Sequence, residues 1–326
     1  MTPPTALDVV RARLRLQPYL TPSPLRESLP LGATAGRRVL LKLESLNLTH
    51  SFKIRGAFNA LLALIESHPD PSSRPRVVTA SAGNHGRAMA FAAERLGIAL
   101  VVFTPRTAPK AKTDAIRRHG ATLHLAPDYD AAEQHARDFA DEHGAAFISP
   151  YNHPDVIAGA GTIGLEIVEQ CPDAGTVVVP LGGGGLASGI GLALRAAASY
   201  VRLVGVEADA STPFTTSLAR GAITTINAGP TLADGLAGNL EPGSMTFPLV
   251  QQVVDEVVTV SERALIDAMR RMAADEHLIV EGSSAVAVAA IEGRQVGDAA
   301  GPIVAIVSGA NIDLDTFLAA IGPAGR

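Results

Sequence analysis

The chain has four lysines among 326 residues, against 23 arginines: Lys42, Lys53, Lys110 and Lys112. A reaction that needs a deprotonatable amine therefore has few candidates. Lys53 directly precedes an apolar segment, 54–65, that predicts a helix. The helix dipole disfavours a cation in the first turn, and this field together with partial burial would favour the neutral, nucleophilic amine. An ordinary surface lysine is the alternative for Lys53 taken alone. We expect Lys110 and Lys112 in solvent, and Lys42 on the polar face of a strand.

A second motif consists of small residues between a predicted strand and a predicted helix. It reads Thr79-Ala80-Ser81-Ala82-Gly83-Asn84-His85-Gly86. Small residues at such a turn let backbone N–H groups approach an anion, and a substrate carboxylate would fit there. A helix start capped by Ser81, with Asn84 and Gly86 serving the turn, explains the same residues.

The third motif is four consecutive glycines, Gly182 to Gly185, after the apolar run 177–181. Four glycines cost backbone entropy that a simple connection need not incur, which favours a phosphate cradle at a helix N-terminus. The spacing Gly182-x-Gly184-x-x-Ala187, followed by Glu207, also fits a dinucleotide fingerprint. The rival hypothesis is therefore a dinucleotide-dependent oxidoreductase.

The fourth motif is the end of the apolar run 303–307, which continues into Ser308-Gly309. If that run is a strand, the Ser308 hydroxyl lies at the carboxyl edge of a sheet, where α/β folds place ligands. A simple turn is the alternative.

These motifs require a sheet that positions them. Short apolar runs alternate with segments of helical period, which indicates an α/β fold with parallel sheets covered on both faces. We expect strands at 39–43, 77–80, 99–103, 122–125, 146–148, 176–179, 203–206 and 303–307.

Prolines and turn residues divide the chain into two predicted domains. Residues 68–75 lie in a stretch with three prolines and predict a linker. Another turn-rich break begins at Ser149-Pro150. We expect a small domain, 76–149, inserted in a large one formed by 1–67 and 150–326.

Composition excludes several classes of partner. A net charge of −5 offers no basic surface for nucleic acid. The longest apolar runs are far shorter than the roughly 20 residues of a membrane helix, so we expect no membrane contact. The single cysteine, Cys171, allows no intramolecular disulfide, and the first 16 residues lack the apolar core of a secretory signal. We expect a cytoplasmic protein.

In this order, the four motifs resemble the fold type II pyridoxal-phosphate enzymes, specifically the threonine and serine dehydratases with serine racemase. The resemblance extends over nearly the whole chain through these segments: Thr21 to Leu25, Leu43-Glu44-Ser45, Ser51 to Ala57, Ile157-Ala158-Gly159 and Ser308-Gly309. Neither the lysine motif nor Ser-Ala-Gly-Asn-His is expected in a nicotinamide enzyme. The resemblance implies the cofactor pyridoxal 5′-phosphate and an inserted-domain α/β fold.

The resemblance also implies a role for individual residues. Lys53 would hold the cofactor as a Schiff base and act in catalysis. The other implied cofactor contacts are Phe52 beside the ring, Asn84 at its 3′ oxygen, Gly182, Gly183, Gly184, Gly185 and Leu186 at the phosphate, Gly235 through its backbone, and Ser308 at the pyridine nitrogen. The substrate carboxylate would bind at Ser81, Ala82, Gly83, Asn84 and His85.

The implied reaction is dehydration of L-threonine, L-serine or a related 3-hydroxy amino acid to a 2-oxo acid and ammonia, in amino-acid catabolism. A serine racemase or a β-replacement enzyme is the alternative within the fold. Racemases that this chain resembles have serine where it has Ala82. His50 replaces the usual glycine, and the segment Glu281-Gly282-Ser283-Ser284 replaces the usual Glu-Pro-Thr pattern. Glu207 resembles a metal ligand, but Pro213 stands where metal-binding members have an acid, so we expect no metal. We expect a homodimer.

Overall fold

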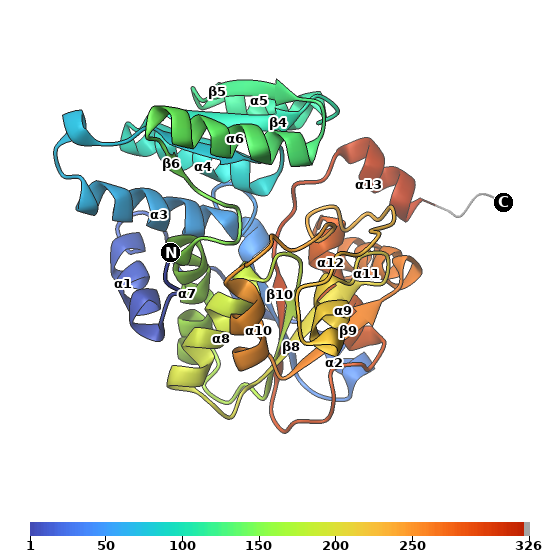
Figure 1. Ribbon diagram of the computed structural model, residues 1–326. Helices are drawn as coiled ribbons and strands as arrows, with labels where there is room; N and C mark the ends of the chain where they lie inside the picture. Colours follow the sequence, from blue (N-terminus) through green and yellow to red (C-terminus); the bar gives the residue numbers. More distant parts are fainter. Residues whose placement is uncertain (323–326) are drawn as a thin grey trace. The chain divides into compact units, whose positions relative to one another are not determined.

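The computed structural model describes residues 1–322 (Figure 1). Contacts within the chain divide it into two compact units. The first comprises Met1–Leu20 and Lys53–Ala160. The second comprises Thr21–Phe52 and the chain from Gly161 onward.

The first unit contains a parallel four-stranded sheet in the order β5-β4-β3-β6. Its strands are β3 (Val77–Ala80), β4 (Leu100–Pro105), β5 (Thr122–Ala126) and β6 (Ala146–Phe147). Its helices are α1 (Ala6–Leu16), α3 (Lys53–Ser67), the 3₁₀ turn η2 (Pro71–Ser73), α4 (Asn84–Leu96), α5 (Lys110–Arg118), α6 (Tyr129–His143) and the start of α7 (Pro154–Gln170).

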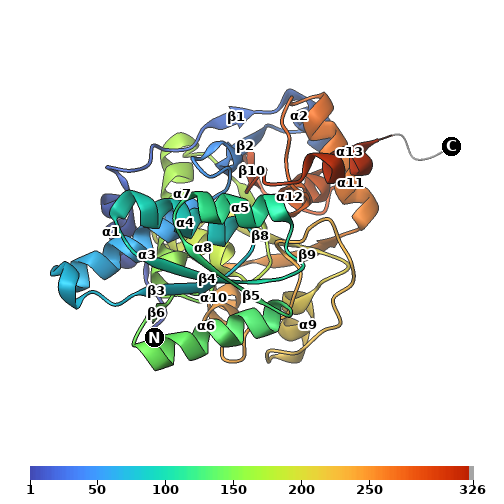
Figure 2. The ribbon, with the colours of Figure 1, turned by 90° about the horizontal axis from the view of Figure 1, so that it is seen from above.

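Helices cover both faces of this sheet, as Figure 2 shows for α6 on one side and α4 with α5 on the other. Val78 and Ala80 of β3 contact Ala136 on the α6 side. Val77, one residue earlier, belongs to the core formed with α3 and α4. Alternate residues of one strand thus enter different cores, because successive side chains point to opposite faces.

The second unit contains a six-stranded sheet in the order β1-β2-β10-β7-β8-β9, in which only the β1–β2 pair is antiparallel. Its strands are β1 (Leu25–Glu27), β2 (Val39–Leu43), β7 (Thr176–Pro180), β8 (Arg202–Ala208), β9 (Glu256–Val260) and β10 (Ile303–Val307). Its helices are α2 (Leu29–Ala35), the 3₁₀ turn η1 (Glu44–Leu46), the end of α7, α8 (Gly185–Ala197), α9 (Pro213–Arg220), α10 (Thr246–Val253), α11 (Glu262–Ala274), α12 (Gly282–Glu292) and α13 (Leu314–Ile321).

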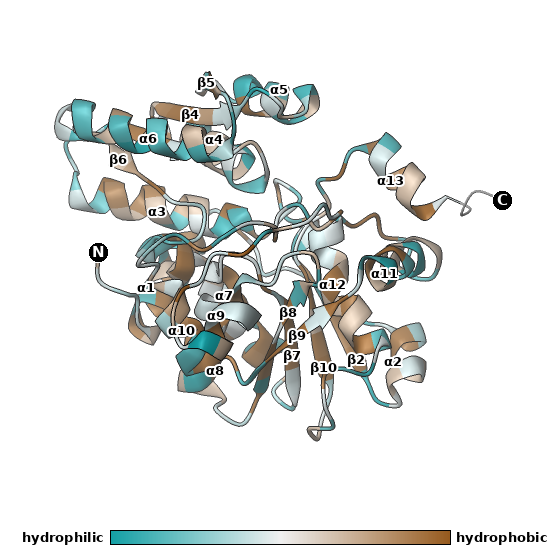
Figure 3. Ribbon diagram, turned by 45° about the vertical axis from the view of Figure 1, so that its right-hand side comes forward, coloured by the Kyte–Doolittle hydropathy of each residue, from teal (hydrophilic) through white to brown (hydrophobic). Residues whose placement is uncertain are grey.

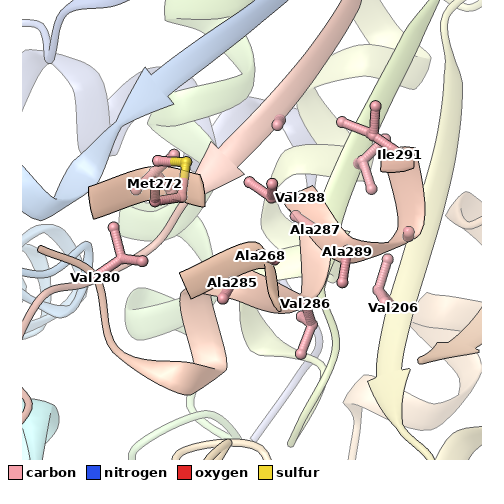
Figure 4. Close-up of a cluster of buried hydrophobic side chains, with 14 of the residues drawn as sticks. Val206, Ala268, Met272, Val280, Ala285, Val286, Ala287, Val288, Ala289 and Ile291 are labelled. Carbon is pink, nitrogen blue, oxygen red and sulfur yellow. The ribbon is translucent and has the colours of Figure 1, made fainter. Parts of the chain in front are cut away.

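The central strands of this sheet are strongly hydrophobic, as the colouring of β7, β8 and β10 in Figure 3 shows. Helix α12 is buried from Gly282 to Ile291. Figure 4 shows its Ala285, Val286 and Val288 in one cluster with Met272 of α11. A helix that is apolar all round belongs in a core, and α12 forms the centre of one.

The predicted α/β class is confirmed, and each of the eight predicted strands corresponds to an observed one. Strands β1 and β9 were not predicted, because β1 has only three residues and β9 is a half-buried edge strand that includes Glu256 and Thr259. The predicted domain bounds stay a prediction; residues 68–75 lie within the first unit and include η2. Within residues 1–322, no helix is long and apolar enough to cross a membrane.

Candidate active site

The segment that precedes Lys53 is attached to the end of β10. The Phe52 N–H donates to the Ser308 carbonyl at 3.0 Å, and Ser51 forms an isolated β-bridge with Gly309. The segment before Lys53 and the segment after β10 lie about 250 residues apart in the sequence, yet their backbones meet in the second unit. Both Phe52 and Ser308 were predicted cofactor contacts, and the structure brings their backbones together.

Ser308 lies at the carboxyl edge of the sheet, directly after β10. It is 3% exposed, and its hydroxyl makes no hydrogen bond within the described residues. A serine hydroxyl can both donate and accept a hydrogen bond. Ser308 can therefore donate to a ligand atom such as an aromatic nitrogen.

The four glycines link β7 to α8 and have little free space around them. Gly184 has φ +85°, and a Cβ there would lie 2.6 Å from Cζ of Phe214. A Cβ on Gly182 would lie 2.9 Å from Cα of Leu236. Glycine is thus required at both positions, for conformation at Gly184 and for close approach at Gly182.

The loop also has free hydrogen-bonding capacity for an anion. Helix α8 begins at Gly185-Leu186 with no capping side chain. Its first N–H groups and the positive end of its dipole suit a phosphate. The hydroxyl of Thr246 donates to the Gly183 carbonyl at 2.8 Å, which fixes the loop without using any of its N–H groups.

Gly235 lies beside the glycine loop. Its carbonyl would be 3.2 Å from a Cβ on Gly182, and its own N–H donates to Oγ of Ser283 at 2.9 Å. The structure thus groups Gly235 with Gly182, as the predicted roles require. Because the Gly235 N–H is already bonded, its carbonyl and Cα are the parts that can contact a ligand.

Lys53 is the first residue of α3, in the first unit. Its Nζ donates to the carbonyl of Pro150 at 2.7 Å. The side chain is half-buried, so the amine is held by the protein and is not dispersed in solvent. Pro150 was not among the predicted site residues; it was predicted only as part of a turn-rich break.

The predicted carboxylate-binding loop also lies in the first unit, between β3 and α4. Its Ser81 Oγ accepts the N–H of Gly83 at 3.2 Å. A Cβ on Gly86 would lie 2.4 Å from the Ser81 carbonyl, so glycine is needed for the loop to fold back on itself. Helix α4 begins at Asn84 without a capping side-chain hydrogen bond, which leaves backbone donors for an anion.

His85 is an exception within this loop because its side chain is buried. It is 2% exposed, and its Nε2 lies 3.3 Å from the Ile148 carbonyl. A carbonyl only accepts hydrogen bonds, so Nε2 carries the proton and Nδ1 the lone pair. Burial, with a smaller effect of the Lys53 charge, lowers the pKa of His85 to about 3. A contact of His85 with a carboxylate would therefore come from its backbone.

Glu207, the residue that resembled a metal ligand, caps a helix. Its two carboxylate oxygens accept the backbone N–H groups of Phe214 at 2.7 Å and Thr215 at 2.9 Å, and the Thr215 hydroxyl at 2.6 Å. Burial raises the pKa of Glu207 despite these bonds. The carboxylate stabilises the start of α9.

These groups fit pyridoxal phosphate. The uncapped α8 start with its close-packed glycines suits the phosphate, and the partnerless Ser308 hydroxyl suits the pyridine nitrogen. Lys53 supplies the amine. Thr246 and Ser283 support the glycine residues, but they lie far along the chain from the glycine loop, and no sequence pattern points to them.

Comparisons with known proteins agree with this fit. The family described as pyridoxal-phosphate dependent enzyme matches residues 16–309. The chain is 41% identical to L-threonine ammonia-lyase of Geobacter sulfurreducens, over 86% of this chain and 69% of the relative. It is 40% identical to L-threonine ammonia-lyase of Thermotoga maritima, over 95% and 76%. The structure of maize serine racemase matches with a TM-score of 0.90 and 33% identity, covering 98% of this chain and 97% of that one.

The family match confirms the predicted cofactor and excludes the dinucleotide-dependent oxidoreductase as the explanation of the four glycines. The site residues themselves stay predictions that the geometry supports. The chain belongs to the family of pyridoxal-phosphate-dependent enzymes.

Proposed function

We propose that this enzyme dehydrates L-threonine, L-serine or a related 3-hydroxy amino acid to a 2-oxo acid and ammonia. The family and its ammonia-lyase members make the chain a pyridoxal-phosphate-dependent lyase, as predicted. One observation carries the assignment of residues. The N–H of Phe52 is bonded to the carbonyl of Ser308, so the predicted cofactor lysine directly follows a residue fixed to the predicted partner of the pyridine nitrogen.

Each step of the proposed reaction would depend on particular residues of the chain. The segment Ser81 to His85 orients the substrate carboxylate through groups other than the Ser81 N–H, which donates to the Phe103 carbonyl, and the Gly83 N–H, which donates to Oγ of Ser81. The neutral amine of Lys53 takes the Cα proton, forming an N–H bond as the C–H bond breaks. Bound pyridoxal phosphate supplies a conjugated system that takes up the electron pair left at Cα. The hydroxyl group then leaves with its bonding electrons and a proton, as water; a second water replaces the amine, which leaves as ammonia.

The leaving hydroxyl needs a proton source, and Glu281 is one candidate in this chain. It is buried at the start of α12, and its Oε2 accepts the N–H of Asn311 at 3.1 Å. A Cβ on Gly309 would lie 2.6 Å from its Oε1, so the carboxyl group lies against the residue that follows Ser308. The cofactor phosphate is the other candidate.

Racemisation is the second candidate function, because the chain is similar to maize serine racemase. Racemisation needs an acid on the face of Cα opposite Lys53. Ala82, at the position where the resembling racemases have serine, has no proton to give. The lack of a proton donor at position 82 favours elimination over racemisation.

A 2-oxo acid assay tests the proposal. The purified enzyme, loaded with pyridoxal phosphate, is incubated with L-threonine, L-serine and bulky or acidic 3-hydroxy amino acids. We expect equal amounts of 2-oxo acid and ammonia from at least one of them. Formation of the D-isomer without ammonia from every substrate would overturn the proposal in favour of racemisation.

We also propose a cytoplasmic homodimer that acts in amino-acid catabolism. The single cysteine supports a reducing compartment: it is buried, and burial raises its pKa to about 11, which keeps the thiol unreactive. Exposed apolar side chains on α1, including Leu7 and Leu14, support a subunit interface. Sedimentation of the enzyme and of Leu14→Arg tests the dimer, and identical monomeric behaviour of both would contradict it.

A further inference from the structure

The hydrogen bond between Lys53 and Pro150 shows which group the amine contacts in this structure. Nζ of Lys53 donates to the Pro150 carbonyl at 2.7 Å. Pro150 lies in an irregular segment between β6 and α7, outside any helix or strand. A carbonyl in such a segment can hold an amine in place only if its neighbours are fixed.

On the N-terminal side, the carbonyl of Ile148 is held by two buried donors. The Thr79 hydroxyl donates to it at 2.7 Å, and His85 donates through Nε2 at 3.3 Å. Both side chains are almost completely buried. Ile148 is thus fixed to β3 and α4, two residues before Pro150.

On the C-terminal side, the start of α7, which follows the irregular segment, is fixed to α3, the helix that begins with Lys53. Nδ2 of Asn59 donates to the Asp155 carbonyl at 2.7 Å. A Cβ on Gly56 would lie 2.9 Å from the carbonyl of Val156, so α3 and the start of α7 are in close contact. Pro150 therefore lies between two anchored points, and its carbonyl has a defined position relative to the lysine.

The imidazoles near this segment are neutral. Burial lowers the pKa of His85 to about 3 and the pKa of His153 to about 4. Nδ1 of His153 accepts the N–H of Asp155 at 3.3 Å, which requires a lone pair there. Neither ring therefore adds a positive charge beside this segment at neutral pH.

We propose that the Pro150 carbonyl is the resting acceptor of the Lys53 amine whenever the amine is not bonded to the cofactor, and that His85 is a positioning residue that fixes this carbonyl through Ile148. This inference rests on the proposed function. A neutral amine that donates one N–H to the carbonyl keeps its lone pair, and the lone pair is held in one direction. It can then form the new N–H bond as the Cα–H bond breaks; the electron pair of that bond would stay at Cα, where bound pyridoxal phosphate would supply a conjugated system to stabilise it.

Three variants test the role of His85. His85→Phe removes the donor to Ile148, and His85→Gln keeps an N–H donor. Val102→Ala is a control that removes packing from the buried cluster to which Ile148 also belongs, but leaves both donors to the Ile148 carbonyl in place. In each full-length enzyme, kcat, KM and the isotope effect of Cα-deuterated substrate are measured. A readout without substrate is the rate at which the Lys53–cofactor bond absorbance develops when pyridoxal phosphate is added to the cofactor-free chain.

Misplacing a catalytic group by 1 Å can cost about 100-fold, so we expect His85→Phe to lower kcat by roughly 10- to 100-fold while KM changes by less than about threefold. The isotope effect should rise, and the Lys53–cofactor bond should form at least about tenfold more slowly, because the amine is no longer presented. His85→Gln should recover both rates to within about threefold, and Val102→Ala should lose no more than that.

Three outcomes would overturn the inference. Equal losses in His85→Phe and Val102→Ala would reduce His85 to a packing residue. A rise in KM alone would make His85 part of substrate binding. If His85→Phe does not fold, Thr79→Val removes the other donor to Ile148, and an unchanged bond-formation rate in that variant would equally contradict us. The bond-formation rates need no substrate, so they separate a failure of this inference from a failure of the proposed function.

Discussion

At the scale of single residues, the lysines differ in what holds the amine. Lys42, expected on a polar strand face, is instead fully buried, and its Nζ pairs with Glu166 at 2.6 Å; that expectation was wrong. Lys110 is 87% exposed and pairs with Asp114 one helical turn away. Lys53 is half-buried and donates to a backbone carbonyl, an acceptor that carries no full charge. Its amine is thus held in place by a backbone acceptor.

We predict that borohydride reduction of the loaded enzyme attaches the cofactor to Lys53. The reason is that Lys42 forms a buried ion pair with Glu166, and Lys110 is exposed and paired with Asp114. Lys53, in contrast, directly follows Phe52, whose N–H is bonded to the Ser308 carbonyl. Peptide mapping by mass spectrometry locates the adduct. The matched control is Lys53→Arg, which should carry no adduct and no yellow absorbance. An adduct on Lys42, Lys110 or Lys112 would overturn the site assignment.

A second prediction at this scale concerns Ala82, which is half-buried in the loop before α4. Ala82→Ser should increase racemisation relative to elimination, because it adds a hydroxyl that can return a proton to Cα on the face opposite Lys53. Ser308, the proposed partner of the ring nitrogen, is a neutral hydroxyl, so we expect the wild-type carbanion to be short-lived and to expel its hydroxyl group. Chiral chromatography of serine and an ammonia assay give the ratio. D-serine formed by the wild type as fast as ammonia would contradict this argument.

At the scale of elements, the sequence predicted the strands whose side chains are buried on both faces, because such strands are continuous apolar runs. It did not predict β1 and β9, which lie at the two edges of the six-stranded sheet, where burial no longer sets the pattern. The turns that carry the site were predictable from glycine and serine. Their supports were not: Thr246 holds the Gly183 carbonyl from a helix 63 residues away.

The glycine loop gives a prediction with a close control. Gly184→Ala should weaken cofactor binding by at least about tenfold, equivalent to about 1.4 kcal/mol, because its Cβ would press on Phe214 and displace the loop. Valine at this position would disturb Phe214 still more, so alanine is the better test. Gly221→Ala is the control, since Gly221 also has positive φ, +71°, but a Cβ added there would meet no atom within 4 Å.

Both variants should lose stability of the order of 1 kcal/mol from the left-handed backbone conformation, and Gly184→Ala should lose more because its Cβ also presses on Phe214. Only Gly184→Ala should change the dissociation constant of pyridoxal phosphate, measured by equilibrium titration of the full-length chain. Equal affinity of the two variants for pyridoxal phosphate would mean that the four glycines are needed for the turn between β7 and α8 and not for phosphate binding.

At the scale of the whole molecule, buried charges join parts of the chain that the sequence cannot pair. In the second unit, Glu166 of α7 accepts from Nζ of Lys42 in β2 and from the N–H of Ser23 at 3.1 Å. These contacts connect the segment 21–52 to the chain beyond residue 160, which is how two distant stretches form one unit. No local sequence pattern predicts that Lys42 and Glu166, 124 residues apart, form a pair. Whether a charged side chain can be buried depends on the partner that the fold places beside it.

The buried histidines of the first unit make the stability of the molecule depend on pH. In the folded chain, burial holds the pKa of His85 at about 3 and that of His153 at about 4. In the unfolded chain, a histidine takes up a proton below about pH 6.5. Below about pH 6.5 the unfolded state thus binds more protons than the folded state. The free energy of unfolding is therefore highest above about pH 6.5 and declines as the pH falls toward the folded-state pKa values, about 4 for His153 and about 3 for His85.

We therefore predict that lowering the pH from 7 to 5 destabilises the wild type by about 2 kcal/mol for each of these two histidines, since one pKa unit corresponds to about 1.4 kcal/mol. Urea unfolding of the loaded full-length enzyme at both pH values measures the loss. His85→Gln should lose about 2 kcal/mol less than the wild type between pH 7 and pH 5, because glutamine does not titrate. His143→Gln, at an exposed position in α6, should behave as the wild type does. An equal loss in His85→Gln and the wild type would show that His85 is not held neutral by burial.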